Sequence, residues 1–479
     1  MFSHVYTRNV LEPAYDNWKA MFAENILAVH KAHLVGLVEQ GIISMERGSK
    51  IARAMQEMQI EFEYPESIPP NVEDLYFVYE HELGARIGEE NAAYLHTARS
   101  RNDMDITVFR MALRGALIEF AGHAIGLVDE LVSRSRASPD ALTILYTHGQ
   151  PANVSTMAHY LTAFAGELID DIIDIVAAIG AVNVSPMGAC AITGTGFPLD
   201  RAGVARRLGF PAFIVNTYQA ISTSHWLTRP TSAMETLLQD CTRLVADLSH
   251  KASCEVGIVT FPDELVQASS IMPQKRNPVI LEHARIQAGL ALGTIASIRE
   301  LYRNVAYQDV NEAADAPVSA LLRTLPIAAS ALDLMKEIVR NIGTDEDKVR
   351  SMATTFGVTT TELADTLVRE AGIGFRSAHE ICSRYVRSGN DLGALRAAFL
   401  EIAGSVFPFS DLQVADILTP DRFVAVRSLS GGPSPQGMAP VFARIEGSLT
   451  AMRTELLSAS QAIRVAGAKL AEDWLELLR

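Results

Sequence analysis

The chain has 479 residues, of which 48% are hydrophobic and 20% charged, as expected for a globular protein with a large core. Its net charge of −15 argues against binding to nucleic acid or to an anionic membrane surface. Four cysteines without a C-x-x-C pair, and a start without the basic-then-apolar pattern of a signal peptide, favour a reducing cytoplasm. The longest apolar run, 172–184, is too short to span a bilayer.

Helical periodicity dominates the sequence, so we predict a mostly α protein. Helices of roughly 20 residues, each about 30 Å long, indicate an extended bundle. The segment 290–298 is apolar on more than one face, which favours burial against another subunit, although a central helix of a monomer would give the same pattern. The long candidates are 111–132, 156–180, 234–248, 279–303 and 320–341.

Breaks in the helical pattern suggest three domains. We expect an N-terminal helical domain at 1–108, a central long-helix bundle at 109–355 and a C-terminal helical domain at 356–479. Small residues and glycines make 186–198 a loop between helices, and the turn at 430–435 precedes a last helix.

A first polar cluster, His96 to Asp103, brings two guanidiniums together with hydroxyl and amide groups. Arginine binds a carboxylate through two parallel hydrogen bonds, and serine and asparagine add directional ones. Ser100, Arg101 and Asn102 are therefore candidate carboxylate ligands. A solvated helix cap with surface arginines would look the same.

A second cluster, Tyr146 to Pro151, places His148 beside Thr147 and Gln150, ahead of a long helix. Such a histidine can act as an acid or orient another group, although a lone histidine more often has a structural role.

The third cluster, Ala268 to Pro278, places paired serines next to a lysine, an arginine and side-chain amides, just before a helix. A hydroxyl acts as a base only if its alkoxide is stabilised, and a lysine and a helix N-terminus supply that stabilisation. Ser269 or Ser270 is thus a candidate base, with Lys275 and Asn277 as anion ligands. Glu282 could pair with a distant imidazole, or could be a surface carboxylate.

Neither metal-ligand spacing nor a nucleotide-binding motif occurs in the sequence, so we expect no cofactor and no metal. The substrate predicted from the three clusters is a small anionic molecule.

At these residues the chain resembles the fumarase/aspartase superfamily and, within it, argininosuccinate lyase. The superfamily loop G-S-S-x-M-P-x-K-x-N is similar to Ala268–Asn277, and the subfamily motif H-T-G-R-S-R-N-D is similar to His96–Asp103. T-H-x-Q matches Thr147–Gln150, and further likeness lies at 185–201 and 375–381, so the resemblance covers nearly the whole chain.

The resemblance implies the three-domain fumarase/aspartase fold and a homotetramer whose sites each draw on three subunits. It implies β-elimination from an N-substituted aspartate, giving fumarate and a free amine. Fixed positive donors would stabilise the aci-carboxylate intermediate. Ser269 matches the usual base, with its neighbour Ser270 as the alternative, and Lys275 and Asn277 would bind the carboxylate that gains charge. Ser100, Arg101 and Asn102 would hold the succinyl part, Thr147, His148 and Gln150 would lie at the site, and Glu282 matches the partner of the histidine.

The chain departs from the family pattern at several positions. Alanines replace motif glycines at 98 and 268, and Cys190 replaces a third, so loop geometry is expected to differ. In the segment that faces the amine, Tyr307 is retained, Asn311 stands where the family has glutamine, and a lysine lacks a counterpart. His30 stands where a serine is common.

The succinyl half of the site is therefore intact and the amine half is altered. Argininosuccinate is one predicted substrate, and ethylenediamine-disuccinate is another that suits an altered amine pocket. Adenylosuccinate is a third, because the segment at 147–152 also resembles that subfamily, although Gln274 and the R-S-R-N-D cluster argue against it. A non-catalytic structural relative is the rival class.

Overall fold

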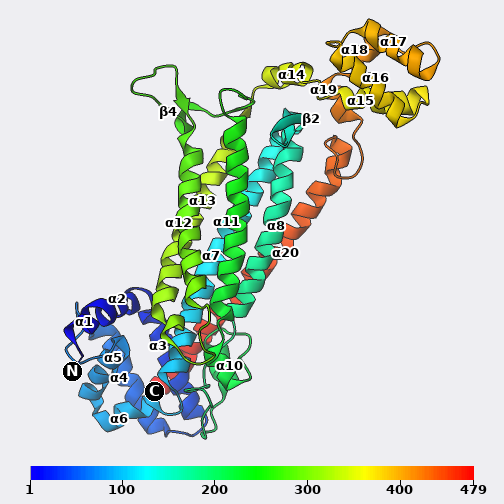
Figure 1. The fold of residues 1–479 in the computed structure, drawn as a ribbon. Coiled ribbons are helices and arrows are strands. Elements are labelled where there is room, and N and C mark those ends of the chain that lie inside the picture. Colours follow the sequence, from blue (N-terminus) through cyan, green and yellow to red (C-terminus); the bar gives the residue numbers. More distant parts are fainter. Residues whose placement is uncertain (1) are drawn as a thin grey trace.

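Five long helices lie side by side at the centre of the computed structural model, which describes residues 2–479 (Figure 1). All five were predicted, and each observed helix begins and ends within a few residues of its prediction or extends beyond it. They are α7 (Arg101–Ala137), α8 (Met157–Val182), α11 (His225–Lys251), α12 (Val279–Leu301) and α13 (Asp315–Asn341).

The predicted apolar faces form the core of this bundle. Leu113, Leu117 and Phe120 of α7 and Leu237 and Leu244 of α11 are at most 1% exposed. A capping box at Ser100 and Asp103 starts α7, and the Thr156 side chain caps α8 by accepting a hydrogen bond from the backbone N–H of His159. Helical periodicity and capping chemistry therefore agree along the bundle.

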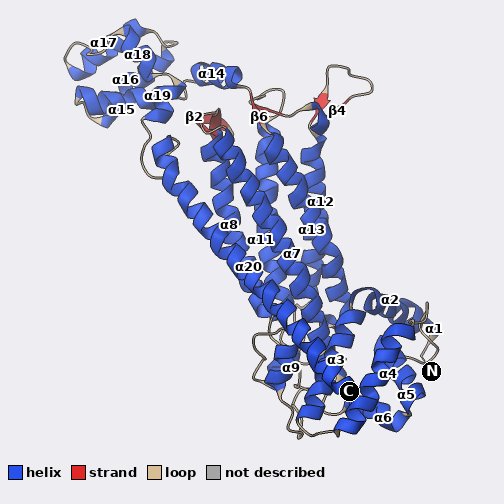
Figure 2. Ribbon diagram, turned by 180° about the vertical axis from the view of Figure 1, so that it is seen from behind, coloured by secondary structure: helices blue, strands red, loops and turns tan. Residues whose placement is uncertain are grey.

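Shorter helices lie beyond both ends of the bundle (Figures 1 and 2). One end carries the N-terminal helices and the connections between bundle helices. These are α1 (His4–Tyr6), α2 (Glu12–Met21), α3 (Ala23–Glu39), α4 (Met45–Glu61), α5 (Leu75–Ile87), α6 (Glu89–Ala93), α9 (Arg201–Arg207) and α10 (Thr217–Ser222).

Beyond the other end lie α14 (Glu346–Thr355) and a small helical body with its own core, which includes Leu367, Ile381 and Phe399. Its elements are α15 (Thr360–Ala371), α16 (Phe375–Arg387), α17 (Leu392–Ala403), α18 (Asp411–Ile417) and α19 (Pro420–Ala425). The last helix, α20 (Pro435–Leu478), returns along the bundle, and its Trp474 donates to Gln56 of α4 at 3.0 Å.

The expected domain limits divide this architecture unevenly. Residue 108 lies inside α7, which continues from the N-terminal helices into the bundle. The unit expected at 356–479 is distributed between the small helical body and α20. The three-domain division by residue number remains a prediction.

Strands are few and short in the described residues. β1 (Leu142–Thr147) and β2 (Gln150–Thr156) form an antiparallel hairpin that the sequence analysis missed. β3 (Val259–Thr260) pairs with β6 (Gly343–Thr344), and β4 (Gln267–Ala268) pairs with β5 (Arg276–Asn277). The hairpin and the β4–β5 ladder each present one predicted polar cluster.

By length and composition alone, 101–137 and 311–341 could cross a membrane. Both run through the bundle, and half of the most apolar window of each is buried there. The core of the bundle therefore accounts for their apolar composition.

Candidate active site

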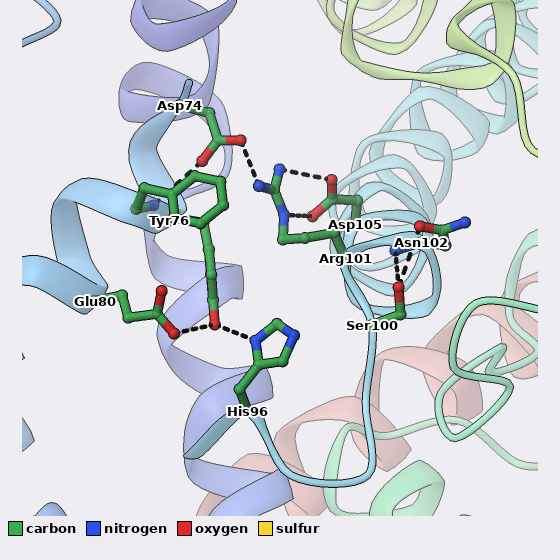
Figure 3. A network of polar contacts seen from close by, with 9 residues as sticks. Asp74, Tyr76, Glu80, His96, Ser100, Arg101, Asn102 and Asp105 are labelled. Atoms are coloured by element: carbon green, nitrogen blue, oxygen red, sulfur yellow. Dashed lines mark hydrogen bonds and ion pairs between the residues drawn. The ribbon is translucent and has the colours of Figure 1, made fainter. Parts of the chain in front are cut away.

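Ser100 and Asn102 begin α7 and are partly engaged in its cap (Figure 3). The Ser100 backbone N–H donates to Asp103 Oδ1 at 2.9 Å, and the Ser100 hydroxyl donates to Asn102 Oδ1 at 3.2 Å. Asn102 Nδ2 donates to the carbonyl of Ala191 at 3.4 Å. Ser100 and Asn102 therefore take part in the helix cap, and they are also the candidate ligands for a substrate carboxylate.

Arg101 is held by two carboxylates of its own chain (Figure 3). Its Nε and Nη2 donate to the two oxygens of Asp105 at 3.2 and 2.9 Å, and Nη1 pairs with Asp74. Burial alone would lower the pKa of Arg101, but Asp105 and Asp74 raise it above its ordinary value. Because the bidentate face is used by Asp105, a substrate carboxylate could use only the N–H groups that remain on Nη1 and Nη2.

A hydrogen-bonded group of side chains from α5 and from the short 3-10 turn Tyr94–His96 supports this cluster. The Tyr76 hydroxyl contacts His96 Nδ1 and donates to Glu80 at 3.0 Å. Burial raises the pKa of Tyr76 to about 12 and, together with Arg99, lowers the pKa of His96. Figure 3 shows that this group lies beside the Asp74–Arg101–Asp105 ion pairs.

His30, which stands where a serine is common in the family, is fully buried. Arg99 Nη1 donates to its Nδ1 at 2.9 Å, and burial lowers its pKa well below the usual value, so the imidazole is neutral. His30 therefore acts in this chain as an acceptor for Arg99.

Two of the residues that replace motif glycines keep glycine-like backbone geometry. Ala98 has φ 58° and Cys190 has φ 52°, both left-handed, and Cys190 Sγ donates to the Ala98 carbonyl at 3.4 Å. Asp103 accepts from the backbone N–H groups of Gly188 and Cys190 at 2.8 and 2.9 Å. These contacts hold the loop in a left-handed backbone at both positions, and a difference from the family in loop geometry or mobility stays a prediction.

Thr147, His148 and Gln150 lie at the exposed tip of the β1–β2 hairpin. His148 and Gly149 both have positive φ, 52° and 72°, as a two-residue hairpin turn requires. The turn places the imidazole away from the core. The sequence contains a signal for this turn, since a two-residue segment with glycine lies between two stretches that contain β-branched residues.

The third cluster is a loop closed by β4 and β5. The Ser269 hydroxyl oxygen accepts hydrogen bonds from the backbone N–H groups of Ile271 and Met272, at 3.3 and 3.0 Å. The Ser269 N–H donates to the carbonyl of Lys275 at 3.4 Å. Two N–H donors aimed at one hydroxyl oxygen would also stabilise an alkoxide there. Ser270 is exposed in the same loop.

Lys275 and Glu282 line a cavity of about 630 Å³ between this loop and the ends of α11 and α12. Gln274, Arg276 and Arg285 line it as well, so cations outnumber carboxylates. Arg276 donates to the Phe261 carbonyl at 3.1 Å and pairs with Asp263, which anchors the base of the loop. A cavity with this excess of positive charge suits an anion.

Tyr307 lies between α12 and α13, at the opposite end of the bundle from the loop. Its backbone carbonyl accepts from the Tyr218 hydroxyl of α10, and the two rings meet edge to face at 5.5 Å. Tyr307 is therefore at the same end of the molecule as Ser100, Arg101 and Asn102.

One chain does not bring all the predicted residues together (Figure 1). The hairpin tip and the Ser269 loop belong to one end of the bundle, and the Ser100–Asn102 cluster belongs to the other. Between the ends runs α7, whose 37 residues span about 55 Å at 1.5 Å per residue. Within one chain, Arg101 and Ser269 cannot contact the same small substrate.

Comparison with known proteins places this architecture among the lyases with the fumarase/aspartase fold. A lyase family model matches residues 15–293, and an argininosuccinate lyase C-terminal model matches residues 357–425. Argininosuccinate lyase 2 of Agrobacterium fabrum is 37% identical over 99% of this chain and 96% of that protein. Argininosuccinate lyase of Methanosarcina acetivorans is 30% identical over 96% of both chains. This chain belongs to the argininosuccinate lyase family and is a carbon–nitrogen lyase, as its motifs predicted.

Solved structures agree with this assignment. An EDDS lyase double variant with bound fumarate has a TM-score of 0.85 and 27% identity, covering 96% of this chain and 92% of that one. A class II fumarase from Schistosoma mansoni, at 14% identity and a TM-score of 0.64, shares the fold.

Proposed function

We propose that the protein catalyses reversible β-elimination of an N-substituted aspartate, giving fumarate and a free amine. The observation that carries the proposal is the Ser269 hydroxyl oxygen, which accepts two backbone N–H donors in a loop that also contains Lys275. This environment favours the alkoxide, the form of serine that can remove a proton.

The proposed step begins when Ser269 removes the proton from the carbon next to a carboxylate. The electron pair of that C–H bond forms an aci-carboxylate, whose added charge Lys275 and Asn277 stabilise. The carbon–nitrogen bond then breaks, its electrons stay on nitrogen, and the amine takes up a proton. His148, with Glu282 as its partner, is a candidate donor of that proton.

The proposed assembly is a homotetramer in which each site draws on several subunits. Its support is the location of Ser100–Asn102 and the Ser269 loop at opposite ends of a bundle about 55 Å long. Exposed apolar side chains on α12, such as Ile286 and Leu290 at 51% and 58% exposure, offer a surface for a neighbouring subunit. A soluble metabolic enzyme of this kind fits the cytoplasm.

Argininosuccinate is the first substrate to test, because the 37% identical relative bears that name. Ethylenediamine-disuccinate is the second. Two observations favour it: the similarity to EDDS lyase structures, and the segment after Tyr307, in which a lysine of the family lacks a counterpart. Adenylosuccinate remains a third candidate.

The experiment supplies each of the three compounds to purified protein and follows fumarate by its ultraviolet absorbance. Fumarate from one compound identifies the substrate, and the Ser269→Ala variant is the matched control for enzyme-dependent release. Absence of fumarate from all three would favour the structural-relative alternative over the proposed reaction.

A further inference from the structure

Lys251 is a buried lysine at the end of α11 for which the proposed reaction has no role. Its side chain is 1% exposed, and burial is the main cause that lowers its pKa. Its ammonium donates to the carbonyl of Ile144 in β1 at 2.7 Å, and the Asp247 carboxylate lies 3.8 Å away. Burying an ammonium costs free energy that an apolar side chain of similar size would not, so its contacts should indicate its role.

The contacts of the ammonium gather at the base of the β1–β2 hairpin. The nitrogen lies 4.9 Å from the ring centroids of Tyr146 in β1 and Tyr160 in α8. The Tyr160 hydroxyl donates to Asp247 at 2.6 Å, and Tyr146 also packs edge to face on His250. Tyr146 directly precedes Thr147 and His148, so the ammonium contacts the strand just below the hairpin tip.

The backbone of Lys251 bonds to the segment that leads to the other candidate cluster. Its carbonyl accepts the N–H of Ile258 at 3.0 Å, and Ile258 directly precedes β3. The chain then continues to the loop of Ser269 and Lys275. Lys251 therefore holds the hairpin through its side chain and the start of the loop segment through its backbone.

We propose that Lys251 is a positioning residue that fixes the hairpin tip, with Thr147 and His148, relative to the end of α11. The proposal rests on the proposed function, in which the hairpin tip lies at the site. Lys251 does not touch substrate, and it acts through the orientation of β1.

The test compares Lys251→Met, which keeps the length of the side chain without its charge, with Lys251→Arg, which keeps a donor and a charge. Lys336→Met in α13 is the control for loss of a lysine elsewhere in the bundle. Lys251→Met should lower kcat by about tenfold or more, since small misplacements of reacting groups are costly, while Lys251→Arg recovers most of it. Wild-type kcat in Lys251→Met would overturn the proposal and leave the proposed reaction intact.

A second readout separates positioning from a general loss of stability. In a His148→Asn background, Lys251→Met should add little further loss, because both changes act on the same group. Losses that multiply would contradict the proposal.

Hydrogen exchange provides a readout that does not depend on turnover. In Lys251→Met the amides of 142–153 should exchange about tenfold faster or more, while those of α7 stay unchanged. Equal acceleration across the bundle, or none in the hairpin, would overturn the positioning role. If no substrate yields fumarate, hydrogen exchange still tests whether Lys251 positions the hairpin.

Discussion

Subunits that are inactive for different reasons should restore activity to one another in this protein. Consider Ser269→Ala, which removes the proposed base, and Asn102→Leu, which removes an amide of the proposed succinyl pocket. The two positions lie at opposite ends of a bundle whose helix α7 spans about 55 Å, whereas one substrate can contact both only if they lie within a few ångströms of it. If both residues serve one site, as proposed, that site takes them from different chains.

The size of the recovery follows from random assembly. In an equal mixture, a site receives an intact loop from one chain half of the time and an intact Asn102 cluster from another chain half of the time. About one quarter of the sites in mixed, symmetric oligomers would then carry both intact groups. The expected activity is about one quarter of wild type, where each variant alone has almost none.

The assay denatures and refolds the two variants together and measures fumarate release, with separately refolded variants as controls. Differently tagged chains establish that mixed oligomers have formed. If mixed oligomers are present and remain as inactive as the single variants, the two residues do not serve one shared site, and the assembly proposed above is wrong.

Three further predictions test individual residues. Ser269→Ala should lower turnover by about 10²–10⁴-fold and still bind substrate, whereas Ser270→Ala should keep far more of the wild-type turnover. Near-normal turnover in Ser269→Ala would exclude Ser269 as the base. Arg101→Lys should raise KM severalfold, because lysine cannot reproduce the fork that Asp105 and Asp74 hold in place, and an unchanged KM would remove Arg101 from the site. Burial raises the pKa of Asp103 from 3.8 to about 6, which corresponds to roughly 3 kcal/mol. A raised carboxyl pKa means that the folded state binds the proton more tightly than the unfolded chain does, so this contribution to stability is full below about pH 4 and is lost as pH rises through 6. Thermal unfolding of Asp103→Asn should therefore change less between pH 5 and pH 7 than that of wild type, and parallel curves would contradict this reasoning.

The helices of the bundle and the chemistry of the three polar clusters could be predicted from the sequence, because both depend on neighbours along the chain. Apolar residues three and four apart define the buried face of α7 wherever that helix packs. Ser269 and Ser270 lie six and five residues before Lys275, so their proximity to its ammonium follows from the local sequence. The same local motifs predicted that the chain belongs to a lyase family.

Other features depend on residues far apart in sequence, and only the tertiary structure decided them. Asp74 pairs with Arg101, which lies 27 residues further along the chain. Asp103 accepts hydrogen bonds from the backbone N–H groups of Gly188 and Cys190, more than 80 residues away, and these bonds hold Cys190 in its left-handed conformation. The hairpin under His148 has a β-bulge between Leu145 and Tyr146, which disturbs the two-residue alternation of side chains that marks a strand. The sequence also could not show that the length of α7 separates the clusters, because packing between distant segments sets the direction in which each helix crosses the bundle.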